Sequence, residues 1–187
     1  MSAQYSRRRF LAQSAHTTAA AALAVQSQTA ARAANGSEKV KIGQIGVGHS
    51  HAEGKMRVYR NSPEFDVVGI VEPDDSLRRK AQSMPTYRDL PWMTQEQLLN
   101  QPGLQAVAVE TSVSDLLAAA EAAVDAGMHI HLDKPAGTSL PRFESILHTA
   151  DSMRRTVQMG YMYRYNPGVL LLKDLLQKGW LGEIFEV

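Results

Sequence analysis

Short apolar or β-branched runs alternate with longer segments of helical spacing along most of the chain, from residue 40 onward. The runs occupy residues 40–47, 65–71, 105–110, 129–132 and 156–161, and they are typical of buried strands. The segments at residues 50–60, 74–83, 95–100, 114–126 and 139–154 have the spacing of helices. Because parallel strands need crossover connections, this order predicts an α/β fold, a doubly wound parallel sheet with helices on both faces.

Polar residues and glycine mark several predicted helix ends. Ser114 with Asp115 is expected to cap the helix over residues 114–126, and Ser139 the helix over residues 139–154. Gly127 is expected to end the first of these two helices.

The first 33 residues differ from the rest of the chain. Residues 6–11 (SRRRFL) fit the twin-arginine export pattern, an Ala-rich stretch follows, and Ala31 and Ala33 place small residues two apart, as a signal peptidase requires. The alternative is a basic tail with no targeting role. We predict a signal peptide over residues 1–33, with export to the periplasm. The sequence has no Cys, so this localisation rests on the leader alone.

The net charge of the whole chain differs from that of the chain without the leader. The leader holds four of the 20 basic residues and none of the 19 acidic ones, which leaves a formal net charge of −3 after residue 33. A mildly acidic body gives no reason to expect nucleic acid or an anionic membrane as a partner. The apolar run of the leader is too short to span a bilayer.

The strand and helix pattern changes after residue 161. Asn166-Pro167-Gly168 predicts the start of a new helix, and residues 182–187 (GEIFEV) predict another strand. One helix and one strand do not make a sheet domain. We therefore predict a dinucleotide-binding domain over residues 38–161 and, over residues 162–187, the first elements of a second, incomplete α+β domain.

Gly46-Val47-Gly48 lies between the first predicted strand and the first predicted helix. In a Rossmann fold this turn receives a pyrophosphate, because glycine permits close backbone approach and the next helix offers free N–H groups. The usual third glycine is His51 here. The turn favours a dinucleotide site, with a purely structural turn as the alternative.

Glu72 ends the second predicted strand, 26 residues after Gly46. An acid at this place accepts hydrogen bonds from the adenosine ribose and repels a 2′-phosphate, which favours NAD over NADP. Arg78 and Arg79 are candidates for binding that phosphate, so NADP stays the second choice. The alternative is a turn residue beside Pro73.

His49 and His51 invite a metal hypothesis, because both side chains could face one ion. Two histidines two residues apart, without a nearby Cys or acid at ligand spacing, are weak evidence for a metal site. We predict helix-capping or phosphate-facing roles and no metal.

Thr111 and Ser112 end the third predicted strand, at the same carboxyl edge as Gly48 and Glu72. Ligands of open α/β sheets lie at this edge, so the two hydroxyls are candidates for cofactor contact, with turn residues as the alternative. Glu110 is unusual in a central strand, and we expect an unidentified neighbour to satisfy its charge.

Residues 129–137 (HIHLDKPAG) end a strand on Asp133-Lys134-Pro135. Lys134 is placed to project from the carboxyl edge toward the nicotinamide end of a bound cofactor. An ammonium there is able to hold a substrate oxygen and exchange its proton as hydride moves. The alternative is a surface salt bridge with Asp133.

Taken together, these motifs resemble the Gfo/Idh/MocA oxidoreductases, named for glucose-fructose oxidoreductase and inositol dehydrogenase. The resemblance covers residues 40–187 and is carried by Gly46-Val47-Gly48, Glu72, Thr111-Ser112, residues 131–135 and residues 160–167. It implies a Rossmann domain followed by an open antiparallel sheet domain that binds a sugar, polyol or related substrate. It also implies association into homo-oligomers through that sheet.

The resemblance assigns roles to two residues. Lys134 matches the family's lysine near the nicotinamide, and Arg164 lies at the passage between the domains. Asp133 replaces the more frequent Glu, Ser112 a common Pro, and Leu116 a frequent His. The family's Asp and His pair that completes catalysis belongs to the second domain.

We therefore predict the nucleotide-binding part of an exported NAD(P)-dependent oxidoreductase acting on a sugar or polyol. The alternatives are an NAD-dependent glycosidase of the same fold and a non-catalytic nucleotide-binding remnant, and this part alone is expected to be inactive. The predicted catalytic residue is Lys134. The predicted cofactor-binding residues are Gly46, Gly48, His49, Ser50, Glu72, Thr111, Ser112, Asp133, Lys134 and Arg164.

Overall fold

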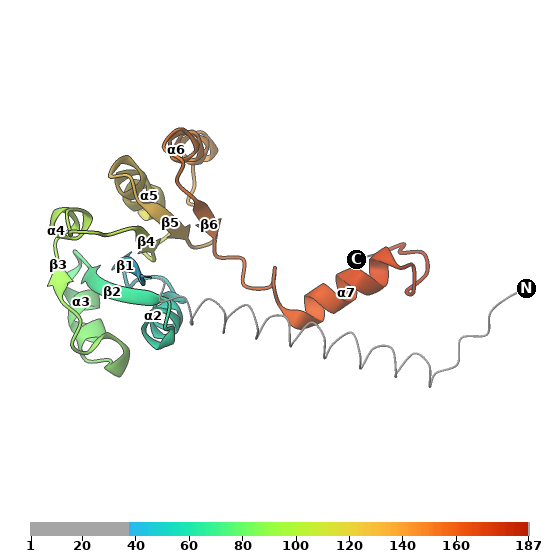
Figure 1. Ribbon diagram of the computed structural model, residues 1–187, viewed down its shortest axis with the longest axis horizontal. Coiled ribbons are helices and arrows are strands. Elements are labelled where there is room, and N and C mark those ends of the chain that lie inside the picture. The colour runs from blue at the N-terminus through green and yellow to red at the C-terminus, as the bar shows by residue number, and fades with distance from the viewer. Residues whose placement is uncertain (1–37, 187) are drawn as a thin grey trace, which may run out of the picture. The chain divides into compact units, whose positions relative to one another are not determined.

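The computed structural model describes residues 38–186, and its centre is one six-stranded parallel sheet with the order β3-β2-β1-β4-β5-β6 (Figure 1). The strands are β1 (Val40–Ile45), β2 (Phe65–Val71), β3 (Trp92–Met93), β4 (Ala106–Val109), β5 (His129–Leu132) and β6 (Val157–Met159). The predicted doubly wound parallel sheet is confirmed. Its edge strand β3 was not predicted, because two residues are too few to show an alternation.

Helices cover both faces of the sheet (Figure 1). One face packs against α2 (Ala52–Asn61), α3 (Asp75–Gln82) and the short 3₁₀ helix η1 (Pro85–Tyr87), through Met56, Tyr59 and Ala81. The other face packs against α4 (Gln95–Leu99), α5 (Leu116–Asp125) and α6 (Leu140–Ser152) in the largest apolar cluster of the described residues.

Alternate residues of β4 and β5 give these two faces different chemistry. Val109 and Leu132 point into the apolar cluster beneath α5 and α6. The other face of the same strands carries His131, and beyond the strand ends it carries Glu110 and Asp133. Polar groups therefore gather on the α2 side of the sheet, at its carboxyl edge.

Side chains define some of the helix ends and not others. The Asp74 carboxylate accepts hydrogen bonds at the start of α3, and Thr94 forms a capping box with Gln97 at the start of α4. Gly127, at φ +78°, follows α5 as predicted. Asp115 and Ser139 occupy the predicted N-cap positions of α5 and α6, but neither side chain accepts a hydrogen bond from a helix amide. The Asp115 carboxylate instead accepts a hydrogen bond from the hydroxyl of Ser112 at 2.6 Å.

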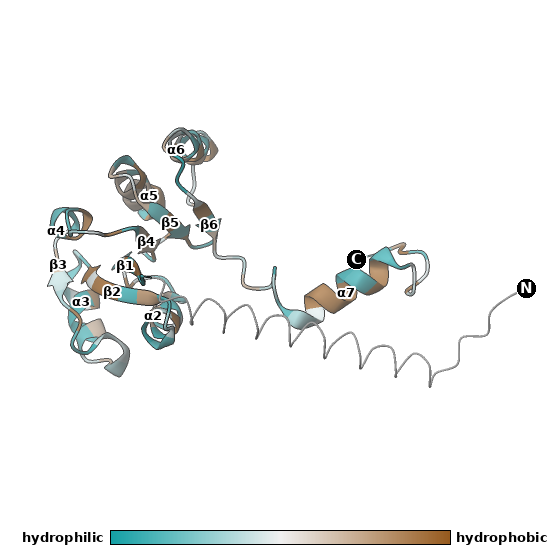
Figure 2. Ribbon diagram, in the orientation of Figure 1, coloured by the Kyte–Doolittle hydropathy of each residue, from teal (hydrophilic) through white to brown (hydrophobic). Residues whose placement is uncertain are grey.

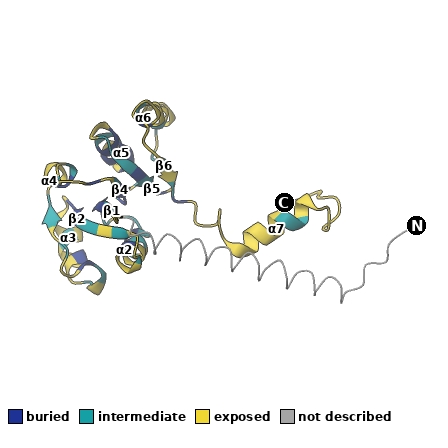
Figure 3. Ribbon diagram, viewed as in Figure 1, coloured by how far each residue is buried: buried dark blue, intermediate teal, exposed yellow. Residues whose placement is uncertain are grey.

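Residues 162–186 contain one regular element, α7 (Pro167–Gln177), which Asn166 caps as the sequence predicts. None of its residues is buried (Figure 3), although it carries hydrophobic bands (Figure 2). The predicted strand over residues 182–187 is wrong, since residues 182–186 are not in a strand. A strand needs a partner for its backbone N–H and C=O groups, and residues 182–186 are not part of the sheet.

The predicted signal peptide over residues 1–33 lies outside the described residues. Within residues 38–186, the longest helices fall short of the length and apolarity that a membrane crossing requires.

Candidate functional site

The glycine turn after β1 is fixed by close contact with the end of β4. Gly46 has φ +89°, and a Cβ atom there would lie 2.5 Å from the backbone nitrogen of Thr111. Its N–H donates to the carbonyl of Val71 at 2.7 Å, and the N–H of His49 donates to the carbonyl of Glu110 at 2.9 Å. The turn therefore joins β1, β2 and β4 and leaves its backbone close to the sheet edge, as a pyrophosphate-binding turn requires.

Glu72 holds this turn in place. Its side chain is buried, and its two carboxylate oxygens accept the N–H groups of Val47 at 2.8 Å and Asp74 at 2.9 Å. Each oxygen keeps a lone pair for a further donor such as a ribose hydroxyl. Arg78 forms an ion pair with Asp75, so its charge is partly neutralised.

A cavity of about 640 Å³ lies beside the glycine turn. Its volume and its place at the carboxyl edge suit the adenosine half of a dinucleotide. The predicted cofactor residues that line it are Gly48, Glu72, Thr111 and Ser112. The structure thus brings these four together, and the residues present fit the group.

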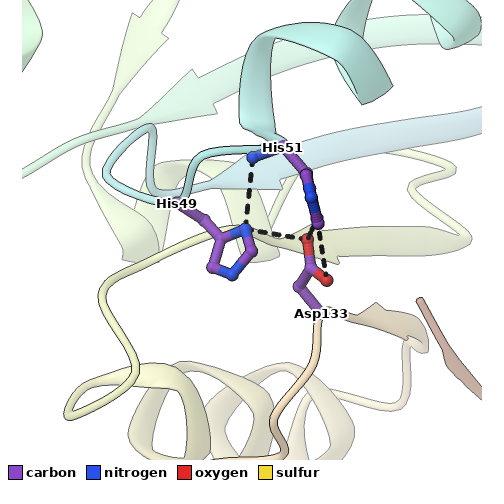
Figure 4. Close-up of side chains that lie close together, drawn as sticks. All are labelled: His49, His51 and Asp133. Atoms are coloured by element: carbon purple, nitrogen blue, oxygen red, sulfur yellow. Dashed lines mark hydrogen bonds and ion pairs between the residues drawn. The ribbon is translucent and has the colours of Figure 1, made fainter. Parts of the chain in front are cut away.

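A second group of polar side chains meets at Asp133, which is completely buried. His49 and His51 point at its carboxylate from the β1–α2 loop and the start of α2 (Figure 4). Their Nδ1 atoms lie 2.9 Å and 3.1 Å from Asp133 Oδ2. On the other oxygen, Oδ1 accepts the backbone N–H of Lys134 at 2.6 Å.

Lys55 is the neighbour that satisfies Glu110. Its Nζ lies 2.7 Å from Glu110 Oε1 and 2.9 Å from Asp133 Oδ2, so one ammonium joins two buried carboxylates. The sequence indicated that Glu110 needed such a partner, but not which residue it was. Lys55 comes into reach because it faces the sheet one helical turn after His51.

Burial shifts the pKa values of this group in different directions. Burial raises the pKa of Glu110 to about 7, although Lys55 opposes the shift. Burial alone would also raise the pKa of Asp133, but hydrogen bonds from Lys55 and the Lys134 amide outweigh it and hold that pKa well below its usual range. Burial lowers the pKa of His49, with Asp133 opposing.

His131 forms the outer part of the same group. Its Nδ1 hydrogen-bonds the hydroxyl of Tyr59 at 2.8 Å. Its Nε2 and Glu110 Oε2 are buried atoms without a hydrogen-bond partner among residues 38–186. Burial, followed by the nearby charge of Lys55, lowers the pKa of His131 to about 4.

His49, His51 and Asp133 also meet the geometric condition for a metal site, since their ligand atoms all lie within 4.8 Å of one another. However, the Lys55 ammonium already contacts Asp133 Oδ2 at 2.9 Å. A divalent ion would be placed against this positive charge. The arrangement favours an ion-paired carboxylate, and the prediction of no metal stays a prediction.

Lys134 itself is exposed at the end of β5. Its backbone is held on both sides, because its N–H donates to Asp133 and its carbonyl lies 3.2 Å from His49 Nε2. The peptide bond from Lys134 to Pro135 is cis. Within the described residues, the ion-pair partners of Asp133 are His49, His51 and Lys55. The salt bridge between the Asp133 carboxylate and the Lys134 ammonium, the alternative considered above, is not formed among them.

The remaining predicted residues lie farther along the same edge. Ser50 borders a cavity of about 400 Å³ that Lys55, His131, Gln158, Tyr161 and Tyr165 also line. Arg164 is exposed and lies over the ring of Tyr161, 5.8 Å from its centroid. Nothing in the sequence pattern had indicated the roles of Tyr59 and His131, because a tyrosine on a helix and a histidine on a strand are ordinary core residues.

Comparison with known proteins gives a family match and several relatives. The GFO_IDH_MocA family model, described as an oxidoreductase family with an NAD-binding Rossmann fold, matches residues 40–161. An uncharacterised oxidoreductase of Escherichia coli, YdgJ, is 26% identical over 152 residues, which is 79% of this chain and 42% of the relative. An inositol 2-dehydrogenase of Acidothermus cellulolyticus is 30% identical over 149 residues, which is 76% of this chain and 42% of the relative.

Solved structures agree on the fold. A 3-ketoreductase from Actinomadura kijaniata, in complex with TDP-benzene and NADP, superimposes with a TM-score of 0.69 at 21% identity. The match covers 79% of this chain and 46% of that chain. This chain therefore spans less than half the length of the proteins it is similar to.

Proposed function

This chain belongs to the GFO_IDH_MocA oxidoreductase family, in which it forms the NAD-binding Rossmann domain, and on that premise we propose that it is the cofactor-binding part of an exported oxidoreductase of sugars or polyols. The observation that carries the proposal is the Lys134 backbone, held by Asp133 and His49 directly beside the glycine turn. This arrangement supports Lys134 as the side chain that acts at the cofactor edge.

The residues around Gly46 would hold the cofactor. Within the described residues the N–H groups of Gly48 and Ser50 have no acceptor, so they and the start of α2 would face a pyrophosphate, and Glu72 offers lone pairs to a ribose. The carboxylates of Glu72 and Asp74 line the same cavity, where they disfavour a 2′-phosphate. NAD is therefore the preferred cofactor in this proposal, and NADP is the second choice.

Lys134 would act on the substrate. When bound, the nicotinamide supplies the acceptor for a hydride. The Lys134 ammonium is exposed at the strand end, where it can donate a hydrogen bond to a substrate hydroxyl and exchange a proton at that oxygen. Asp133 does not neutralise this ammonium, because its carboxylate is paired with Lys55 and two histidines.

The cavity of about 400 Å³ is the place proposed for the substrate. Tyr161 and Tyr165 offer apolar ring surfaces, while His51, Lys55 and Gln158 offer hydrogen-bonding groups. Flat apolar surface beside convergent polar groups suits a polyhydroxylated ring. Inositol 2-dehydrogenases among the relatives support this substrate class.

The test of this function is Lys134→Ala, assayed in the native protein with sugars and polyols plus NAD. We expect kcat/KM to fall about 100-fold, because positioned proton transfer contributes at least that much, while NADH affinity by fluorescence titration stays within about twofold. The same titration with NADPH checks the cofactor preference.

Lys39→Ala is the matched control, since Lys39 is an exposed lysine at the opposite end of β1. Unchanged turnover in Lys134→Ala would remove Lys134 from the mechanism. Release of a free sugar without net NADH would indicate the glycosidase alternative. Failure of the chain to bind either nucleotide would overturn the proposal altogether.

Export through the twin-arginine pathway is part of the proposal, and residues 6–11 support it. Replacing the motif's pair, Arg7→Lys with Arg8→Lys, is expected to keep the protein in the cytoplasm, because the pathway recognises the paired arginines. Cell fractionation measures this. The same substitution at Arg32 is the control, and a periplasmic location of the Arg7 and Arg8 double variant would count against export by this route.

A further inference from the structure

We propose that Lys55 is a positioning residue, whose ammonium joins the Glu110 and Asp133 side chains so that Asp133 can hold the backbone of Lys134 at the cofactor edge. The inference rests on the proposed function for the importance of Lys134. Its physical content, the link from Lys55 to the Lys134 amide, stands on contacts that are independent of that role.

The contacts show that Lys55 is the central cation of the group. Its side chain is only 16% exposed, and the side chains of Glu110 and Asp133 are 0% exposed. The two Nζ–oxygen distances of 2.7 Å and 2.9 Å place it between carboxyl groups from neighbouring strands. Pairs this well enclosed are screened little by solvent, so the loss of one partner leaves an uncompensated buried charge.

Asp133 connects Lys55 to the backbone of Lys134. An ionised carboxylate is a pure acceptor, and Asp133 faces the Lys55 ammonium and His51 Nδ1 as well as the Lys134 N–H. Lys55 holds Oδ2 of this carboxylate and so fixes the direction in which Asp133 presents Oδ1. Its Oδ1 bond to the Lys134 amide, at 2.6 Å, is therefore sensitive to the charge at Lys55.

Gly160, directly after β6, leaves space for the Lys55 ammonium beside the Asp133 carboxylate. A Cβ atom on Gly160 would lie 2.8 Å from Asp133 Oδ1 and 3.0 Å from Lys55 Nζ. Gly160 also donates its N–H to the carbonyl of Leu132 at 2.9 Å. The ammonium thus stands where the ends of β4, β5 and β6 and the helix α2 meet, and Tyr161 of the proposed substrate cavity follows directly.

Charge, rather than packing, is the feature that Lys55 supplies. Without it, two carboxylates would face each other in a buried site, with the histidines His49 and His51 beside them and His131 and the phenol of Tyr59 next to these. Two close buried carboxyl groups do not both ionise readily, so one takes up a proton. Glu110 takes up that proton first, because burial already raises its pKa to about 7, whereas the pKa of Asp133 lies well below its usual range.

The experiment compares Lys55→Met with Arg57→Met at about pH 8, above the raised pKa of Glu110. Methionine keeps the length of the lysine stem and removes its charge. Arg57 is a matched control on the same helix, because its ion pair with Glu53 is exposed and worth little. Hydrogen exchange of the Lys134 amide by NMR and NADH affinity by fluorescence are measured on the whole chain.

We expect Lys55→Met to speed exchange of the Lys134 amide and to weaken NADH binding, each by about tenfold or more, and Arg57→Met to change neither. Adding Glu110→Gln to Lys55→Met removes the excess negative charge and should restore most of the protection. Rescue of this kind separates a charge effect from a packing effect. Wild-type exchange in folded Lys55→Met would overturn the proposal.

The double variant decides the matter if Lys55→Met does not fold. A folded double variant with a protected Lys134 amide supports the proposal. A folded double variant with free exchange contradicts it, and so does one that stays unfolded, because the excess charge would then not be the cause. If the proposed function is wrong, Lys134→Ala keeps full turnover. Hydrogen exchange of the Lys134 amide in Lys55→Met still tests the role of Lys55 in that case.

Discussion

Burial acts in opposite directions on Glu110 and His131, which lie on the same side of the sheet. It raises the pKa of Glu110 to about 7, so Glu110 contributes stability below its ordinary value of 4.5 and loses it as the pH rises toward 7. It lowers the pKa of His131 to about 4, so His131 contributes stability above its ordinary value of 6.5 and loses it as the pH falls toward 4. The contributions of Glu110 and His131 therefore change the free energy of unfolding with pH in opposite directions over the pH range that they share.

Single substitutions should therefore reveal slopes of opposite sign. Between the ordinary values of 4.5 and 6.5, Glu110→Gln is expected to make the free energy of unfolding rise with pH, and His131→Gln to make it fall. Each change across that range should be about 2 kcal/mol. Thermal unfolding followed by circular dichroism at several pH values measures it.

Glu96→Gln is the control for this pair, because Glu96 is an exposed acid in the first turn of α4. It should leave the pH dependence of the wild-type protein unchanged. Parallel slopes in Glu110→Gln and His131→Gln would show that burial does not set these two pKa values.

Helix α7 differs from every other helix longer than one turn in the described part of the chain, because it buries no residue. Its stability comes from local features, namely the Asn166 cap and an exposed ion pair between Lys178 and Asp174. Local unfolding of such an element costs little and is not coupled to the sheet core.

Removal of residues 162–187 is accordingly expected to leave the main unfolding transition in place. The midpoint temperature should shift by less than about 3 °C, because none of residues 162–186 is buried. Differential scanning calorimetry measures this. Removal of residues 140–187, which also deletes α6 with its buried Ile146 and Ala150, is the contrasting control and should abolish the cooperative transition. A large loss of stability on removing only residues 162–187 would mean that α7 packs against the sheet.

At the scale of the whole molecule, apolar side chains are concentrated at the exposed carboxyl-terminal end. Between residues 161 and 185 the large hydrophobic side chains that are exposed are Tyr161, Met162, Tyr163, Tyr165, Val169, Leu170, Leu171, Leu172, Leu176, Trp180, Leu181, Ile184 and Phe185. Exposed apolar side chains in such number favour association.

The chain of 187 residues is therefore expected to associate as its concentration rises, whereas the same chain without residues 162–187 stays monomeric. Light scattering after size-exclusion chromatography gives the two masses. Lys178→Ala, which removes an exposed charge of this segment and leaves its apolar side chains in place, should not prevent association. A monodisperse monomer at all concentrations would contradict the expectation.

Most of the sheet followed from the sequence because its strands are short apolar runs with turn residues on either side. The predicted strand over residues 65–71 has the observed bounds, and the one over residues 129–132 does too. The strand predicted over residues 182–187 has the right composition, yet a strand forms only where another strand offers its N–H and C=O groups. Composition carries no information about whether such a partner is present.

The sequence by itself determined the parallel α/β fold and the glycine turn, because periodicity and a left-handed glycine are local properties of the chain. It also indicated that Glu110 needed a partner. Only the tertiary structure decided that the partner is Lys55, which lies 55 residues earlier, and that the Glu72 carboxylate clamps the glycine turn. Contacts between residues distant in sequence depend on how α2 packs against β4 and β5, and this packing is a property of the folded sheet rather than of any single segment.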